Sequence, residues 1–347
     1  YQTVQNLGPD IYAQYFALTT TSFRTDRYML TPDWQRRFWS VVYVDTAPQL
    51  KSILENVEED SGEAALANIL WVYAFHRLTD QFGPIPYFGA ATASDEIPYD
   101  AMDKIYADFF VRLQSAVEIL KEQPADTKIY DGYDLMYNGD IQNWIAFANS
   151  LRLRLALRIS EIDPVKAKSE AEAAIAGGVM DDNSQNASLE KSLDGNDTNG
   201  LSQVGVWNEF AMSSTIASYL KGYEDPRLNI YFQPSIAGGE FNSIRNGMSA
   251  TDLGIARNQS PANSNIGEYW IKYNGNTIEG NLTNRQHIMS AAESYFLRAE
   301  GALNGWNMGG TAKELYNQGI QISMAQWGVS DPAQISAYVS STNKPSQ

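Results

Sequence analysis

The segment MYNGDIQNWIAFANSLRLRLALR, residues 136–158, contains the strongest structural signal in the chain. It opens with the turn-forming residues Asn138-Gly139-Asp140 and then continues without proline or glycine. The apolar side chains that follow recur at three- and four-residue steps on one face of a helix: Trp144, Phe147, Ala148, Leu151, Leu155 and Ile159. The pattern predicts a helix that ends near the Asp163-Pro164 step.

The same periodicity predicts helices on both sides of this segment. One runs from Ser61 to the Gly83-Pro84 step, a second from residue 99 or 100 to about 121, and a third from 164 to 176. Two more occupy 290–303 and 312–327, with small and aromatic side chains that allow close helix approach, as in tetratricopeptide repeats. The sequence therefore predicts a mainly α fold of tetratricopeptide-like helix pairs.

A loop-rich segment, about residues 181–287, interrupts these helices. Asn, Ser, Gly and Asp dominate it, and we predict one helix near 207–221 and short strands around 269–273. Residues 1–60 are crowded with aromatic and turn-forming residues, and helical order is expected only after Pro48. We predict a single domain over 1–347, with a helical scaffold at about 48–180 and 288–328 and a ligand face formed by the loop-rich segment.

The composition leaves few options for catalysis. The chain has 347 residues with no cysteine, which excludes disulfides, thiolate zinc sites and cysteine nucleophiles. Its two histidines, His76 and His287, are too few for a metal centre built on several imidazoles. We therefore expect no cofactor, no metal and no catalytic residues.

The charge balance excludes one class of partner. Twenty-five basic and 41 acidic residues give a formal net charge of −16, which repels nucleic acid and anionic lipid. No stretch reaches the roughly 20 apolar residues of a membrane-spanning helix. The chain begins at Tyr1 with no charged and apolar leader, so any signal peptide is expected to have been removed or left out of this sequence.

Motifs for known chemistries are missing. There is no P-loop, dinucleotide fingerprint, G-x-S-x-G or H-E-x-x-H pattern, although the 41 acidic residues leave a glycoside hydrolase open, because that reaction needs only two carboxylates at a fixed separation. Asp194–Gly200 is similar to a calcium loop, but its glycine falls one position late and no Glu stands at the twelfth position. Arg152, Arg154 and Arg158 are interpreted as structural ion pairs rather than an anion site.

Aromatic residues outside the helical stripes are the candidates for ligand binding. Sugar rings offer apolar C–H faces edged with hydroxyls, so exposed aromatic rings with polar neighbours make a suitable binding surface. By this criterion the candidate residues are Tyr28, Trp34, Trp207, Phe241, Tyr269, Trp270 and Tyr273. The alternative for each is a large side chain that covers the edge of the core.

Four segments together resemble the SusD/RagB family, and specifically its SusD-like subgroup. They are HRLTDQFGPIPY at 76–87, the opening segment at 136–158, DPRL at 225–228 and ESYFLRAEGALNGW at 293–306. The segment at 136–158 is similar to the family pattern Y-x-G-D-x-x-x-W-x-[KR]-F-A-N-S-L-[KR]-x-R-x-A-x-R, and the four occur in the family's order.

The resemblance implies a non-catalytic lipoprotein on the cell surface at the outer membrane. Such a protein captures an oligosaccharide and passes it to a SusC-like TonB-dependent transporter; the alternative is the same role for peptides or another non-glycan ligand. An acidic, aromatic face suits cationic peptides as well as sugars. The chain shows no lipid-bearing N-terminal cysteine and stops at Gln347, so the anchor and a C-terminal part are expected to be missing.

Overall fold

The computed structural model describes residues 2–92, 94, 96–124, 126–194, 197–275 and 277–341. The chain divides into two compact units, and each is assembled from segments far apart in the sequence. The first unit contains Tyr1–Arg37, Leu189–Gln286 and Met324–Gln347, and the second contains Phe38–Ser188 and His287–Ser323. The single domain over residues 1–347 stays a prediction.

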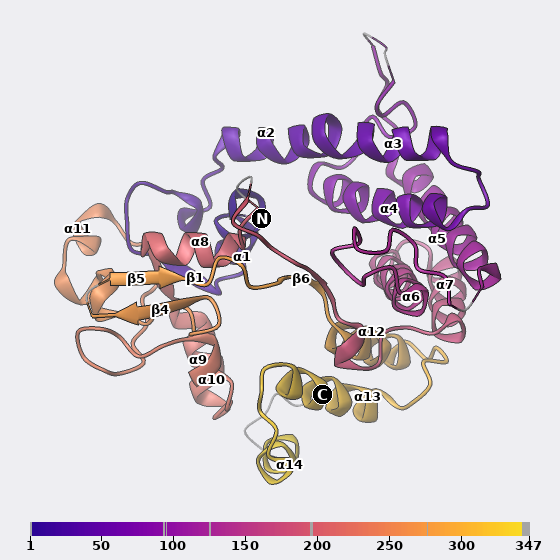
Figure 1. Cartoon of the computed structure of the whole chain (residues 1–347). Helices are drawn as coiled ribbons and strands as arrows, with labels where there is room; N and C mark the ends of the chain where they lie inside the picture. The colour runs from indigo at the N-terminus through magenta and orange to yellow at the C-terminus, as the bar shows by residue number, and fades with distance from the viewer. Residues whose placement is uncertain are drawn as a thin grey trace. The chain divides into compact units, whose positions relative to one another are not determined.

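The second unit is built from helices that pack in pairs. Helix α4 (Gly62–Phe82) packs against α5 (Met102–Glu122), and α6 (Ile141–Arg158) packs against α7 (Pro164–Gly177) (Figure 1). The other elements are η3 (Val41–Thr46), α3 (Ala47–Asn56), η4 (Asn183–Gln185), α12 (Ala291–Leu303) and α13 (Ala312–Gln326), of which α13 continues into the first unit. The predicted helix pairs and the mainly α fold class are confirmed.

Capping side chains explain where these helices begin and end. Asp140 accepts a hydrogen bond from the backbone N–H of Asn143 at 3.1 Å and so starts α6. The same helix ends at Arg158, earlier than the predicted end near Asp163. Asp163 instead caps α7, where its carboxylate accepts from the N–H of Lys166 at 3.0 Å. Residues 159–162 form the turn between the two helices, although the apolar pattern of α6 runs on to Ile159.

Three arginines of α6 connect it to three other helices. Arg152 donates to Glu170 of α7 at 2.6 Å, Arg154 donates to Glu293 of α12 at 2.6 and 2.8 Å, and Arg158 pairs with Asp80 of α4 at 2.9 Å. Each guanidinium thus has a carboxylate partner on a neighbouring helix. This confirms the structural interpretation of the arginines.

The first unit contains short strands and short helices. Strand β1 (Phe16–Leu18) pairs antiparallel with β3 (Phe210–Met212), and β4 (Ile271–Asn274) pairs antiparallel with β5 (Thr277–Gly280). Two further strands, β2 (Ala187–Leu189) and β6 (Gln286–Met289), pair with each other, and most of their residues belong to the second unit. The helices, of which α2 continues into the second unit, are η1 (Gln2–Asn6), α1 (Pro9–Tyr12), η2 (Thr25–Arg27), α2 (Pro32–Ser40), α8 (Gly200–Trp207), α9 (Ser214–Gly222), α10 (Leu228–Tyr231), α11 (Ala250–Leu253), η6 (Ala256–Asn258), η7 (Ser260–Ala262) and α14 (Pro332–Ser340).

The single helix predicted near 207–221 is wrong. Asn208 adopts a left-handed conformation with φ of 55° and ends α8, and β3 follows as the partner of β1. Ser213 then accepts from the N–H of Ile216 at 3.1 Å and starts α9. The predicted short strand near 269–273 is confirmed by β4.

The core of the first unit lies around the β1–β3 pair. The rings of Phe16 and Phe210 stand 4.7 Å apart across the two strands. Leu18, Ile266 and Ile271 are almost fully buried in the same hydrophobic cluster. The strands are short, so this cluster holds together segments that are nearly 200 residues apart in the chain.

Candidate functional site

All seven predicted aromatic residues lie in the first unit, but their exposure differs widely. Tyr28 is 63% exposed and Trp207, the last residue of α8, is 42% exposed. Four side chains are half-buried against the core, namely Trp34, Phe241, Tyr269 and Tyr273. The expectation that Trp270 lies outside the packed core is wrong, because only 9% of it is exposed.

Trp270 is buried because its neighbours close around it. The centroid of its ring lies 5.2 Å from that of Tyr269 and 5.3 Å from that of Trp327. The Trp327 ring also packs against Tyr231, with 5.3 Å between the two centroids. The Tyr269 hydroxyl donates to a backbone carbonyl at 3.3 Å, and burial raises the pKa of Tyr269. Tyr269 and Trp270 are therefore brought together, with Trp270 in the core and Tyr269 half-buried against it, which leaves little of the Trp270 ring for a sugar.

The exposed candidate Tyr28 forms an ordered surface with residues that the sequence did not single out. Its ring lies 5.9 Å from the ring of Tyr12 at an interplanar angle of 14°, so the two are stacked. Gln14 donates its side-chain N–H to the Tyr28 hydroxyl at 3.1 Å, and that hydroxyl donates to the Tyr12 carbonyl at 3.4 Å. The ring is thus backed on one face and held at its edge.

Helix α9 extends this surface. Thr215, in its first turn, donates its hydroxyl to the side-chain oxygen of Gln14. Tyr219 lies one turn further along the same face and is 54% exposed. We call Tyr12, Gln14, Tyr28, Thr215 and Tyr219 the tyrosine surface; its parts come from positions about 190 residues apart, so no spacing in the sequence could have shown it.

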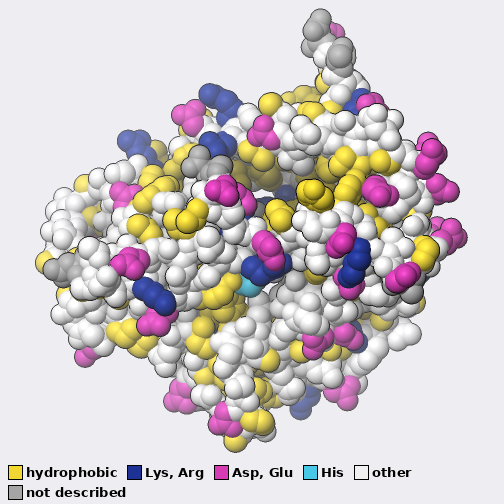
Figure 2. All heavy atoms as spheres, viewed as in Figure 1, with side chains coloured by type: hydrophobic (Ala, Val, Ile, Leu, Met, Phe, Trp, Pro, Cys, Tyr) yellow, Lys and Arg dark blue, Asp and Glu magenta, His cyan; other side chains and the backbone are white. Residues whose placement is uncertain are grey.

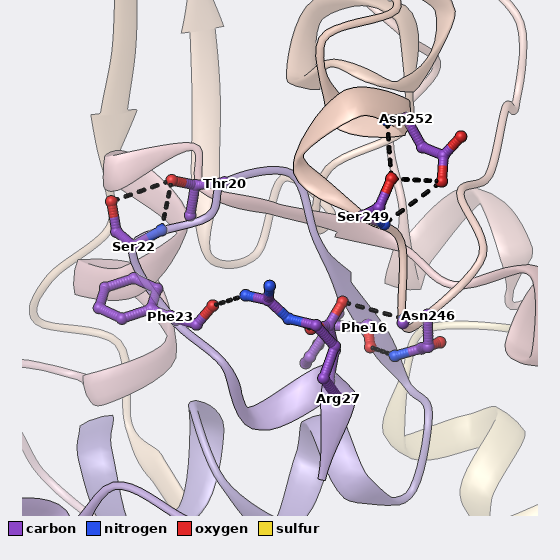
Figure 3. Close-up of polar contacts among 10 residues, drawn as sticks. Phe16, Thr20, Ser22, Phe23, Arg27, Asn246, Ser249 and Asp252 are labelled. Atoms are coloured by element: carbon purple, nitrogen blue, oxygen red, sulfur yellow. Dashed lines mark hydrogen bonds and ion pairs between the residues drawn. The ribbon is translucent and has the colours of Figure 1, made fainter. Parts of the chain in front are cut away.

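Buried polar contacts hold the Tyr28 segment in place, and Figure 3 shows several of them. Arg27 folds back to donate to the carbonyl of Phe23 at 2.7 Å, and Asn246 donates to the carbonyl of Phe16 at 2.8 Å. Asp26 is 5% exposed and accepts from the N–H of Gly247 at 3.3 Å. Burial is the largest influence on Asp26 and raises its pKa, against the opposing effects of this hydrogen bond and Arg27. Tyr28 follows Arg27 at a φ of 54°, and its backbone is held by a hydrogen bond from its N–H to the carbonyl of Thr25 at 2.9 Å.

A pocket of about 480 Å³ lies in the same unit around Phe241. Four chain segments converge on it: the end of α9, residues 241–243, η6 and residues 262–263. We call it the Phe241 pocket; the residues used below are Lys221, Phe241, Asn242, Arg257, Asn258 and Asn263. Apart from Phe241, none of these was predicted as a binding residue, because cations and amides in loops carry no periodic signal.

Nothing in the described residues is arranged for metal binding. No group of three or more His, Asp or Glu side chains in this part of the chain could hold a metal ion. Gly195 and Asn196, within the Asp194–Gly200 segment that is similar to a calcium loop, lie outside the described residues. No helix among the described residues is both long and apolar enough to cross a membrane.

His76 is also not placed for catalysis. It is 1% exposed within α4, and its Nδ1 lies 3.1 Å from the carbonyl oxygen of Val72. Burial, followed by the positive charge of Arg154, holds its pKa well below the usual value. The imidazole is therefore neutral and closed off from solvent.

The acidic side chains are spread over the face shown in Figure 2 rather than gathered at one place.

Comparison with known proteins identifies the family of the chain. A family model described as SusD-like, SusD and RagB outer membrane lipoprotein, matches residues 1–347. A search of the curated proteins finds no match.

Solved structures give close matches. A chitin-binding SusD homologue from Flavobacterium johnsoniae is 34% identical with a TM-score of 0.87, over 99% of this chain and 69% of that one. A SusD homologue from Bacteroides vulgatus is 32% identical with a TM-score of 0.84, over 99% and 68%. A third, described as a chitin-binding protein, is 28% identical with a TM-score of 0.83, over 98% and 75%.

Proposed function

Because this chain belongs to the SusD/RagB family of outer membrane lipoproteins, we propose that it captures an oligosaccharide at the cell surface and delivers it to a SusC-like TonB-dependent transporter. Members of the family are binding proteins and not enzymes. The lipid anchor and the exposure on the cell surface are part of this proposal. Affinity for the ligand then comes from stacking and hydrogen bonding, with no bond broken.

The names of two relatives support a glycan as the ligand. Both the Flavobacterium johnsoniae homologue and the third matched structure are described as chitin-binding. Oligosaccharides of N-acetylglucosamine, the repeating unit of chitin, are therefore the first ligands to test. Their rings have the apolar faces that a tyrosine platform requires.

The observation that carries the proposal is the ring of Tyr28 on the tyrosine surface. It is 63% exposed, its other face rests on Tyr12, and Gln14 holds its hydroxyl. A ring fixed in this way loses little conformational freedom when a sugar stacks on it. We propose that Tyr28 is the main stacking residue and that Tyr219 contributes a second ring.

Replacing Tyr28 with alanine is expected to weaken oligosaccharide binding at least tenfold, since the ring supplies both buried apolar area and stacking. Tenfold corresponds to about 1.4 kcal/mol. The measurement is titration calorimetry with N-acetylglucosamine oligosaccharides. Tyr28→Phe keeps the ring and should lose far less.

The matched control is Tyr133→Ala, which removes an 85% exposed tyrosine from the second unit. It should bind as the unchanged protein does. Equal affinity of the Tyr28→Ala and Tyr133→Ala variants would move the site away from the tyrosine surface. Binding of cationic peptides but of no sugar would favour the alternative ligand class, for which the net charge of −16 is the supporting observation.

A further inference from the structure

The Phe241 pocket contains two cations in a strongly acidic protein. Lys221 stands at the end of α9 and Arg257 in η6, and no Asp or Glu lines the pocket. Within the described part of the chain, neither cation forms an ion pair. The ammonium of Lys221 donates to the carbonyl of Phe241 at 2.5 Å, which fixes it at the pocket wall and leaves two of its three N–H donors. Two cations without an acidic partner form a local site for an anion.

Three asparagines of the pocket supply hydrogen-bond acceptors. Asn242 donates its amide to the carbonyl of Ala262 at 3.1 Å, and Asn258 donates to that of Asp252 at 2.9 Å. Asn263 donates to two backbone carbonyls at 2.9 and 3.0 Å. Because these N–H groups are in use, what the amides have left for a ligand is mainly their oxygens. Such oxygens accept hydrogen bonds from hydroxyl groups.

The pocket also has an apolar wall. Phe241 is half-buried and packs against the core of the first unit. The volume of about 480 Å³ falls within the range of roughly 300–1,000 Å³ that is usual for small-molecule sites. One aromatic wall, several acceptors and two cations match a sugar ring that has an apolar face, hydroxyl donors and a carboxylate.

We propose that the Phe241 pocket binds a uronic acid unit of the captured oligosaccharide, a proposal that rests on the glycan-binding function proposed above. Arg257 and Lys221 hold the carboxylate, the asparagine oxygens accept from the ring hydroxyls, and Phe241 covers the apolar face. We expect the pocket to prefer a carboxylate because the planar guanidinium group of Arg257 can donate two parallel hydrogen bonds to it. The pocket therefore gives the protein a preference for acidic glycans.

The test compares the double variant Lys221→Gln/Arg257→Gln with the unchanged protein by titration calorimetry. The ligands are an oligosaccharide with a glucuronate unit, the same oligosaccharide with glucose in its place, and an N-acetylglucosamine oligosaccharide. We expect the uronate ligand to bind at least tenfold more tightly than its neutral counterpart at low salt, with the preference falling as salt is added. The double variant should lose that preference and keep its affinity for neutral sugars within twofold.

The control variant Arg37→Gln/Lys272→Gln removes the same charge from two exposed positions that do not line the pocket. It should keep the uronate preference. Free glucuronate should compete for the pocket, whereas acetate and sulfate at the same concentration should not, because they lack the ring.

Each outcome has a separate meaning. Neutral sugars bound without any uronate preference, or a preference that survives in the double variant, would overturn the pocket assignment and leave the proposed function standing. No binding of any oligosaccharide by the folded protein would overturn both. Equal competition by acetate or sulfate would show an anion site without specificity for sugars and would also overturn the assignment.

Discussion

Replacing Gly267 with alanine is expected to lower the free energy of unfolding of the first unit by about 4 kcal/mol or more. A Cβ at this position would overlap the carbonyl oxygen of Ile230 and lie 2.8 Å from its carbon. The backbone has no room to move away, because the N–H of Gly267 donates to the carbonyl of Tyr231 at 2.8 Å and Phe232 bridges to Ile266. Urea denaturation followed by tryptophan fluorescence measures the loss, since Trp270 and Trp327 lie in the affected core.

Gly222 provides the matched control. It is the last residue of α9, and a Cβ there would meet no atom within 4 Å. Gly222→Ala should change the unfolding free energy by less than about 1 kcal/mol. If Gly267→Ala were as stable as Gly222→Ala, the close approach of residues 230 and 267 would be incorrect.

Removing the carboxylate of Glu170 is expected to cost the second unit about 3–5 kcal/mol. Glu170 and Arg152 have side chains only 7% and 11% exposed, and they meet at 2.5 and 2.6 Å. Glu170→Ala leaves the buried guanidinium with a contact to Gln114 at 3.4 Å, which cannot replace a carboxylate. The large effect arises from the unpaired charge, and it does not measure the net contribution of the pair.

An exposed ion pair of the same unit shows the contrast. Lys51 and Glu55 are 3.6 Å apart with side chains 31% and 61% exposed. Glu55→Ala should therefore change the free energy of unfolding by less than about 1 kcal/mol. Urea denaturation of the Glu170→Ala and Glu55→Ala variants measures both effects. A loss of similar size in both variants would contradict the assignment of Arg152 as buried and dependent on Glu170.

The helices of the second unit could be predicted because their signals are local. Apolar side chains at three- and four-residue steps, with Ser61, Asp140 and Asp163 as caps, define α4, α6 and α7. Three of the four segments that carry the family resemblance, 76–87, 136–158 and 293–306, lie in this unit, and the family model and the solved structures confirm that resemblance. The expectation of a binding protein rather than an enzyme is confirmed with the family.

The first unit was harder to predict because its order depends on distant contacts. The division of 207–221 into β3 and α9 follows from the pairing of β3 with β1, which no local pattern contains. Trp270 was expected outside the core because it lies outside the helical stripes of the sequence, whereas Trp327 and Tyr269 pack against it in the structure. The tyrosine surface and the Phe241 pocket depend on the same kind of contact, so the sequence could not show which residues lie together in them.

The pairing of β1 with β3 also has a consequence for folding during synthesis, because β1 is made long before its partner strand. Phe16 lies opposite Met212, so 196 residues separate the two partners in the chain. At roughly 5–20 residues per second, a ribosome needs about 10–40 s to make that interval. During this time the apolar residues of β1 have no partner, while the helices encoded between Ala47 and Gly177 are already complete. We therefore expect Phe16–Leu18 to stay without its strand partner for longer during synthesis than any of the helices α4 to α7 stays without its neighbour.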